Sequence, residues 1–191
     1  MASEEGQGAG RGAGGVSAPT LETERLILRQ TRIDDSEALH GLYSDVAAMR
    51  WWSHAPHTTL EETRDTLAER LADPDGYAWS ITLRGDDRAI GTLAAREKRQ
   101  REVAEIGYSL ARAQWGKGYA REAVSRLLTH LFQHEKMRRV FADTDPDNTS
   151  SNGLLEKLGF TLEGRLRGEW DTHIGVRDSY IWGLLADEWR G

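Results

Sequence analysis

The sequence AQWGKGYAREA, residues 113–123, places two glycines and a lysine directly ahead of a regular apolar pattern. Between residues 120 and 132 apolar side chains recur at intervals of three and four, which predicts an amphipathic helix. A helix N-terminus carries unpaired N–H groups and the positive end of the helix dipole. Because small residues ahead of it let a phosphate approach those groups, the stretch predicts a site for a phosphate-bearing ligand.

Two common nucleotide-binding motifs do not account for these glycines. A P-loop needs Ser or Thr after its Gly-Lys pair and a glycine five positions earlier, but the chain has Gly118 and Ala111 there. A dinucleotide-binding turn needs a third glycine where Arg121 stands. From the glycines alone, a lead-in turn without a ligand is an equally good interpretation.

The rest of the chain alternates strand-like and helix-like segments. Strands are predicted at residues 25–29, 77–83, 89–95 and 102–110 before the stretch, and at 138–145, 162–167 and 178–185 after it. Helices are predicted at 34–45 and 59–73, opened by the capping boxes Asp34/Glu37 and Thr59/Glu62, and at 148–160. This order is typical of an α/β protein with a mixed sheet and helices packed on it.

The composition narrows the classes of function. The 191 residues suit one globular domain, and the formal net charge of −6 disfavours broad attraction to nucleic acid. The absence of cysteine excludes disulfides, thiolate metal sites and cysteine nucleophiles. No segment has the apolar length of a membrane span, and the first residues lack the apolar core of a secretory signal. We therefore expect a cytoplasmic protein without membrane or nucleic-acid partners.

The first residues differ in composition from the rest. Six of the first fifteen are glycine, and apolar side chains are scarce. Such a segment cannot offset the entropy lost on ordering, so residues 1–18 are predicted to form a disordered tail. The folded domain is expected over residues 19–191.

Three segments share the order and spacing of one known family. They are EIGYSL at 105–110, WGKGYAREA at 115–123, and NTSSNGLLEKLGF at 148–160. Together they resemble the GNAT superfamily of acetyl-CoA-dependent N-acetyltransferases, and in particular the Rim-type ribosomal-protein N-terminal acetyltransferases. LETERLILR at 21–29 and RDSYIWGLLADEW at 177–189 resemble that branch too. The resemblance implies the GNAT fold, a mixed and mostly antiparallel sheet of about six to seven strands with splayed central strands and flanking helices.

The resemblance also implies acetyl-CoA as co-substrate and no metal. In the family, backbone amides of the glycine-rich turn hold the pyrophosphate, and the strand before the turn pairs with the pantetheine arm. Carried over position by position, this assigns coenzyme contacts to Ile106, Tyr108, Ser109, Leu110, Trp115, Gly116, Lys117, Gly118, Tyr119, Ala120, Asn148 and Ser151.

The implied reaction is direct attack of an amine on the acetyl thioester. Glu105 matches a glutamate of related enzymes and is the candidate general base, with Glu102 or a water chain as alternatives. An ordinary exposed or arginine-paired strand glutamate is the competing interpretation of Glu105.

The coenzyme A thiolate that leaves in this reaction can receive a proton from a side chain. Ser151 matches the family serine near the sulfur and is the candidate proton donor, with Tyr108 and Tyr180 as further donors. Asn148 would also suit a helix N-cap without any coenzyme contact.

Aromatic residues mark the candidate acceptor site. Trp51 and Trp52, and Trp170 with Asp171 and His173 near the other end of the chain, could line it together with Glu105. One core tryptophan and one surface lid is the alternative for the adjacent pair. The favoured acceptor is a protein N-terminal α-amine; a small amine (antibiotic, polyamine or amino acid) and a non-catalytic acyl-CoA sensor stay as alternatives. A homodimer is left open, because sheet edges often dimerise.

Two histidine pairs have a spacing that could suggest a metal. His130 and His134 are four residues apart in the predicted helix, but Leu131 stands where a zinc motif has Glu. Both lie off the apolar stripe, so we expect solvated helix surface. His54 and His57 lack an evident third ligand and are interpreted in the same way.

Overall fold

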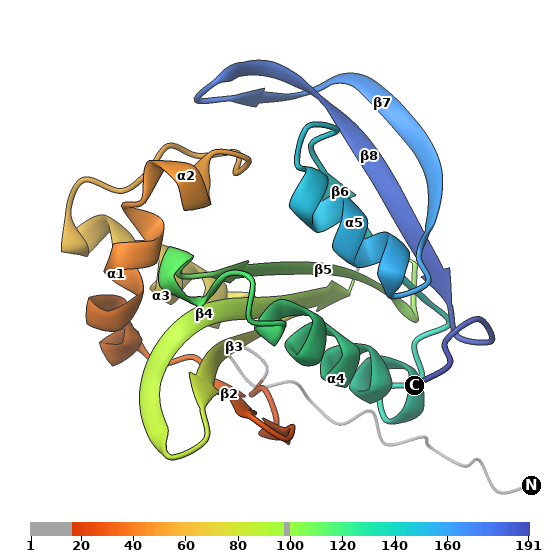
Figure 1. The fold of residues 1–191 in the computed structure, drawn as a ribbon, viewed down its shortest axis with the longest axis horizontal. Helices are drawn as coiled ribbons and strands as arrows, with labels where there is room; N and C mark the ends of the chain where they lie inside the picture. Colours follow the sequence, from red (N-terminus) through yellow and green to blue (C-terminus); the bar gives the residue numbers. More distant parts are fainter. Residues whose placement is uncertain (1–16, 98–99) are drawn as a thin grey trace, which may run out of the picture.

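One mixed sheet forms the centre of the protein (Figure 1). The computed structural model describes residues 17–97 and 100–191, and within them eight strands lie in the order β1-β2-β3-β4-β5-β6-β8-β7. One strand more than predicted is present, because β1 has two residues and is too short to give an alternating pattern. The strands are β1 (Leu21–Glu22), β2 (Leu26–Gln30), β3 (Gly76–Leu83), β4 (Asp86–Glu97), β5 (Val103–Leu110), β6 (Arg139–Thr144), β7 (Thr161–Thr172) and β8 (Gly175–Leu185).

The one parallel pairing in the described sheet is also its shortest contact between long strands. β5 pairs with β6 over Val103–Glu105 against Arg139–Phe141, and every other neighbouring pair is antiparallel. β5 continues to Leu110 and β6 to Thr144 without pairing further with each other. This confirms the splayed central strands that the family resemblance implies.

Helices cover both faces of the sheet. They are α1 (Ser36–Tyr43), α2 (Val46–Met49), α3 (Leu60–Ala72), α4 (Tyr119–Gln133) and α5 (Thr149–Lys157), with 3-10 turns at η1 (Ile33–Asp35) and η2 (Arg112–Gln114). α4 and α5 share the larger core with the strands, and α1 and α3 form a second core on the other face. Within the described ranges no helix has the length and apolarity needed to cross a membrane.

The first predicted helix differs from the observed one. The predicted range 34–45 contains the end of η1 and the whole of α1, which stops at Tyr43. The short α2 follows beyond this range, and Asp45 caps it through its side chain. The predicted Asp34/Glu37 capping box is wrong, because Asp35 is the N-cap of α1 and its carboxylate is bound elsewhere. The Thr59/Glu62 box at α3 is confirmed.

The predicted apolar stripe of α4 is buried, but the prediction for His130 is wrong. Ala123, Val124, Leu127, Leu128 and Leu131 are fully buried, as the pattern predicts. His130 is buried as well, with its ring edge-on to Trp79 from β3 at 6.4 Å between centroids. Trp79 therefore buries a helix position outside the apolar stripe. Burial in turn lowers the pKa of His130.

An ion pair inside the protein sets the path from the sheet to the first helices. Arg29 on β2 and Asp35 are both buried, and their guanidinium and carboxylate form two hydrogen bonds of 2.8 and 2.7 Å. Ser80 Oγ and the Arg32 N–H donate to the same carboxylate. Burial on its own would raise the pKa of Asp35, but these hydrogen bonds outweigh it and lower the pKa.

We expect Asp35→Asn to lower the free energy of unfolding by about 3 kcal/mol at pH 7, because it leaves Arg29 buried without its main counter-charge. In the wild type this stabilisation is complete above pH 3.8, the ordinary aspartate pKa, and disappears as the pH falls through the lower folded-state pKa. Urea unfolding at pH 7 and at lower pH measures both effects. Asp34→Asn, at an exposed neighbour, is the control. Equal stability of the two variants at pH 7 would contradict the expectation.

Candidate active site

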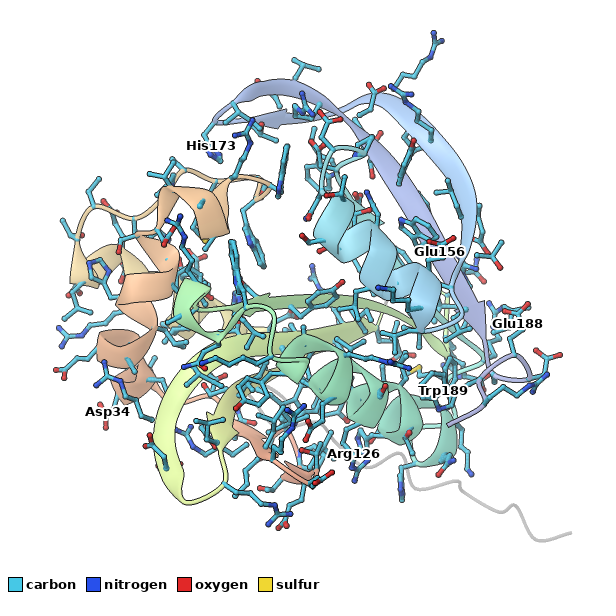
Figure 2. The ribbon with its side chains drawn as sticks, in the orientation of Figure 1. Asp34, Arg126, Glu156, His173, Glu188 and Trp189 are labelled. Atoms are coloured by element: carbon cyan, nitrogen blue, oxygen red, sulfur yellow. The ribbon has the colours of Figure 1, made fainter. Side chains whose placement is uncertain are left out.

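A cavity of about 1370 Å³ lies where β5 and β6 separate. Its walls are the ends of these two strands, the first turns of α4 and α5, the α2 segment, and the β7–β8 hairpin. In Figure 1 the hairpin arches over α5 towards α2, and Figure 2 places His173 at its end. The predicted coenzyme contacts except Lys117 line this cavity, and so do Glu105, Trp51, Trp52, Trp170 and His173. Asp171, the expected neighbour of Trp170 in the acceptor site, is not among the described lining residues. The predicted roles of these residues stay predictions.

The glycine-rich turn leads into α4 with a backbone that suits glycine. Gly116 and Gly118 have φ values of +73° and +82°, in the left-handed region that side chains disfavour. Gly118 is the N-cap of α4 and brings no side chain to the first N–H groups. These groups stay available to an anionic ligand.

Two contacts fix the turn to the sheet. Trp115 Nε1 donates to the carbonyl of Leu110 at the end of β5, at 2.8 Å. Arg25 donates to the carbonyl of Lys117 at 3.0 Å and forms an ion pair of 2.6 Å with Glu122 in the first turn of α4. Lys117 is not among the described lining residues, and its Nζ donates to the side chain of Gln114, which does line the cavity.

The edge of β5 that faces β6 is the second element of the coenzyme prediction. Beyond Glu105 no described strand pairs with this edge, while the opposite edge of β5 pairs with β4 as far as Leu110. Ile106, Tyr108 and Ser109 lie on this segment and line the cavity. The exposed edge therefore offers backbone donors and acceptors to an extended ligand.

Tyr108 and Ser151 both line the cavity, and their hydroxyl groups are neighbours. Burial raises the pKa of Tyr108 to about 12, and the Ser151 hydroxyl opposes the shift. The tyrosine hydroxyl has no hydrogen bond of good geometry to the described residues, so it can donate to a ligand. Tyr180, the other tyrosine considered as a donor, is not among the residues that line the cavity.

Asn148 is the N-cap of α5, as its alternative interpretation predicts. Its side-chain oxygen accepts the N–H of Ser151 at 3.2 Å. This bond orients the first turn of α5 and with it Ser151. Because Asn148 also lines the cavity, the cap and a coenzyme contact are compatible.

Glu105 is the last β5 residue paired with β6, and its half-buried side chain lines the cavity. Glu102, the alternative base, is exposed in the turn before β5 and is not among the described lining residues. Of the two glutamates, Glu105 is the one that lines the cavity in the part of the chain that the structure describes.

Aromatic and charged side chains from other elements also line the cavity. Trp51 and Trp52 are both half-buried and both line the cavity, and Trp52 also packs against the second core. Their role towards an acceptor stays a prediction. The guanidinium of Arg177 on β8 lies 5.7 Å from the Trp51 ring centroid. Arg177 also binds Asp145 through two hydrogen bonds, which connects the hairpin to the end of β6.

The histidines do not form a metal site. The described residues contain no group of three His, Cys, Asp or Glu side chains placed to hold a metal ion. His54 and His57 are half-buried and not the solvated pair expected, because they stack with each other and with Tyr43.

Comparison with known proteins agrees with this geometry. Residues 25–161 match the family model described as the acetyltransferase (GNAT) domain. The chain belongs to the GNAT acetyltransferase family. The GNAT domain accounts for the splayed strands and for the glycine-rich turn before α4, and members of this family take their acetyl group from acetyl-CoA.

Relatives cover nearly the whole GNAT chain. The uncharacterized N-acetyltransferase p20 of Bacillus licheniformis is 34% identical over 90% of this chain and 99% of its own. A probable GNAT acetyltransferase from Chromobacterium violaceum has a TM-score of 0.82, with 25% identity over 98% of this chain and 97% of its own. A RimL ribosomal L7/L12 acetyltransferase solved with coenzyme A shares the fold, with a TM-score of 0.78 and 23% identity over 89% of this chain and 99% of its own.

Sequence reasoning did not identify several residues that hold the GNAT site together. Asn152 uses its whole amide: the oxygen accepts from Thr144 and Trp182, and the nitrogen donates to the carbonyls of Asp145 and Pro146. This network fixes the start of α5 to β6 and β8. The partners lie up to 30 positions apart, and no local pattern marks such contacts.

We expect Gly118→Ala to raise the Kd of acetyl-CoA at least about fivefold, because a side chain strains the left-handed N-cap and displaces the first amides of α4. Its new Cβ would also lie 3.4 Å from the Arg25 guanidinium. Gly85→Ala is the matched control, since Gly85 has φ of +84° in a turn away from the cavity. Calorimetric titration measures both. Equal affinities in the two variants would argue against this role of the turn.

Proposed function

We propose that this GNAT enzyme transfers the acetyl group of acetyl-CoA directly to the N-terminal α-amine of a protein. The observation that carries the proposal is the apolar rim of the cavity. Trp170 and Ile174 of the hairpin line it, yet are 44% and 42% exposed. Exposed apolar side chains at a cavity mouth suit contact with a polypeptide.

The chemistry of the acceptor supports an α-amine. The amine must be neutral to attack, and an α-amine with a pKa near 8 loses its proton at pH 7 for about 1 kcal/mol. A lysine-type amine with a pKa near 10.4 needs about 4 to 5 kcal/mol. A half-buried carboxylate such as Glu105 is enough for the first case.

The proton and bond changes are assigned as follows. The amine nitrogen forms a bond to the acetyl carbon, the C–S bond breaks, and Glu105 takes the proton of the amine. The thiolate has an ordinary pKa near 8.5, so proton transfer from a tyrosine of pKa about 12 costs about 5 kcal/mol. The serine hydroxyl is a weaker acid still, so Tyr108 and Ser151 both stabilise the thiolate by hydrogen bonding, and the thiolate takes its proton from solvent.

A small amine is the second candidate acceptor. The lining contains the carboxylates of Asp45, Glu105 and Asp143, and acidic groups attract cationic amines. The names of relatives include both kinds of acceptor. One is a putative ribosomal N-acetyltransferase of Bacillus subtilis, 33% identical over 88% of this chain, and another is the spermidine N(1)-acetyltransferase of Escherichia coli, 23% identical over 75%.

We expect Glu105→Gln to lower kcat at least about 100-fold, because a general base commonly contributes that factor or more. The Kd of acetyl-CoA should change little, since the amide has the size of the carboxylate. Thiol release at saturating acceptor, followed from pH 6 to 9, measures the effect. The loss should be larger for lysine-type amines than for α-amines. An unchanged kcat throughout this pH range would exclude Glu105 as the base.

The acceptor class is tested by thiol release from acetyl-CoA with N-terminal peptides, lysine peptides, polyamines and aminoglycosides, and mass spectrometry locates the added acetyl group. We expect kcat/KM to be highest for free peptide N-termini, and N-terminally blocked peptides to be inactive. Faster turnover of polyamines or aminoglycosides than of every peptide would favour the small-amine function instead.

A further inference from the structure

Asp143 lies on β6 at the point where this strand leaves β5. Glu105 of β5 is in register with Phe141 of β6. Paired residues of parallel strands point to the same face, and residues two apart on one strand do so as well. Glu105 and Asp143 therefore share one face of the sheet, and both line the cavity. Strand spacing places their Cα atoms about 8 Å apart.

Two neutral groups hold the Asp143 carboxylate in place. Trp170 Nε1 of β7 donates to its Oδ2 at 3.0 Å, and Ser179 Oγ of β8 donates to its Oδ1. Ser179 is fully buried. Because a carboxylate can accept about four hydrogen bonds, these donors orient Asp143 and leave room for another.

Asp143 differs from other aspartates of the cavity in its partners, because those aspartates lie next to an arginine. Asp145 is paired with Arg177, Asp178 with Arg165, and the N-cap Asp45 lies 4.0 Å from Arg112. In the part of the chain that the structure describes, no ion pair is formed by Asp143. A half-buried carboxylate held only by neutral donors favours a cation next to it.

We propose that Asp143 binds a second positive charge on the acceptor, several bonds away from the amine that is acetylated. The inference rests on the amine transfer proposed above, with Glu105 beside the reacting nitrogen. The separation of the two carboxylates fits an acceptor whose two nitrogens are about 5 to 8 Å apart. A peptide with a basic residue next to its N-terminus has this chemistry, and so has a short diamine.

Paired acceptors that differ by one charge test the proposal. The first pair is a peptide with N-terminal alanine followed by lysine or by norleucine, with acetylation at the α-amine quantified by mass spectrometry. The second pair is 1,4-diaminobutane and butylamine. We expect the dicationic member to have about 10- to 100-fold higher kcat/KM on the wild-type enzyme, the range for a hydrogen bond to a charged group.

Asp143→Asn removes the charge with little change in shape. Its amide can accept from Trp170 and donate to Ser179, so both hydrogen bonds that hold the side chain can be kept. We expect the preference for the dication to fall below about threefold through a higher KM, with kcat and the KM of acetyl-CoA changed little. The matched control is Asp171→Asn, at an exposed hairpin residue outside the cavity lining, and it should keep the wild-type preference.

Two results would overturn the proposal: a wild-type enzyme that does not distinguish the members of either pair, or an Asp143→Asn enzyme that keeps the wild-type preference. The first needs no variant, so the proposal is testable even if Asp143→Asn folds poorly. The proposed protein acceptor can fail separately. If neither peptide is acetylated but diaminobutane is strongly preferred over butylamine, the inference about Asp143 stands and the acceptor is a small amine.

Discussion

Backbone N–H and C=O groups that leave a β-ladder must find other partners, and after Glu105 the inner edge of β5 leaves its ladder with β6. The rest of the site is arranged around this edge. α4 begins at the outer end of β5, and α5 begins at the end of β6. The hairpin of β7 and β8 then covers the separated strand ends (Figure 1). The cavity is thus a consequence of chain topology, and side chains adapt it to an acetyl donor and an amine.

Contacts between distant parts of the chain keep the strands apart without closing the gap. Arg25 and Glu122 hold the first turn of α4 against the sheet, and Asn152 holds the first turn of α5. Arg177 connects the hairpin to Asp145 and reaches the ring of Trp51. Each of these side-chain contacts joins two elements that share no backbone hydrogen bonds at that point. The geometry of the site therefore depends on side chains far from the reacting atoms.

The sequence predicts the elements of this fold better than their contacts. The apolar stripe of α4, the Thr59/Glu62 capping box and the glycine-rich turn follow from local patterns, and the structure has all three. The family resemblance added the splay of β5 and β6, which no local pattern shows. The prediction that His130 is exposed to solvent was wrong, because the residue that buries it, Trp79, comes from a distant strand, β3. The roles of Asp35 and Asp143 could not be predicted for the same reason, since their partners are brought to them by folding.

The short β5–β6 ladder divides the sheet into two leaves, β1–β5 and β6–β8. Near residues 103–105 the leaves share rungs of backbone hydrogen bonds and the core beneath α4. At the cavity end no backbone pairing joins β5 to β6 in the described sheet, and Arg177 of β8 contacts instead the ring of Trp51, which follows α2. Opening at this end breaks few backbone bonds, so it can occur far more often than global unfolding. An extended ligand bound along β5 would take the place of a paired strand at this edge. The two leaves would then unfold more as one unit with the ligand bound than without it.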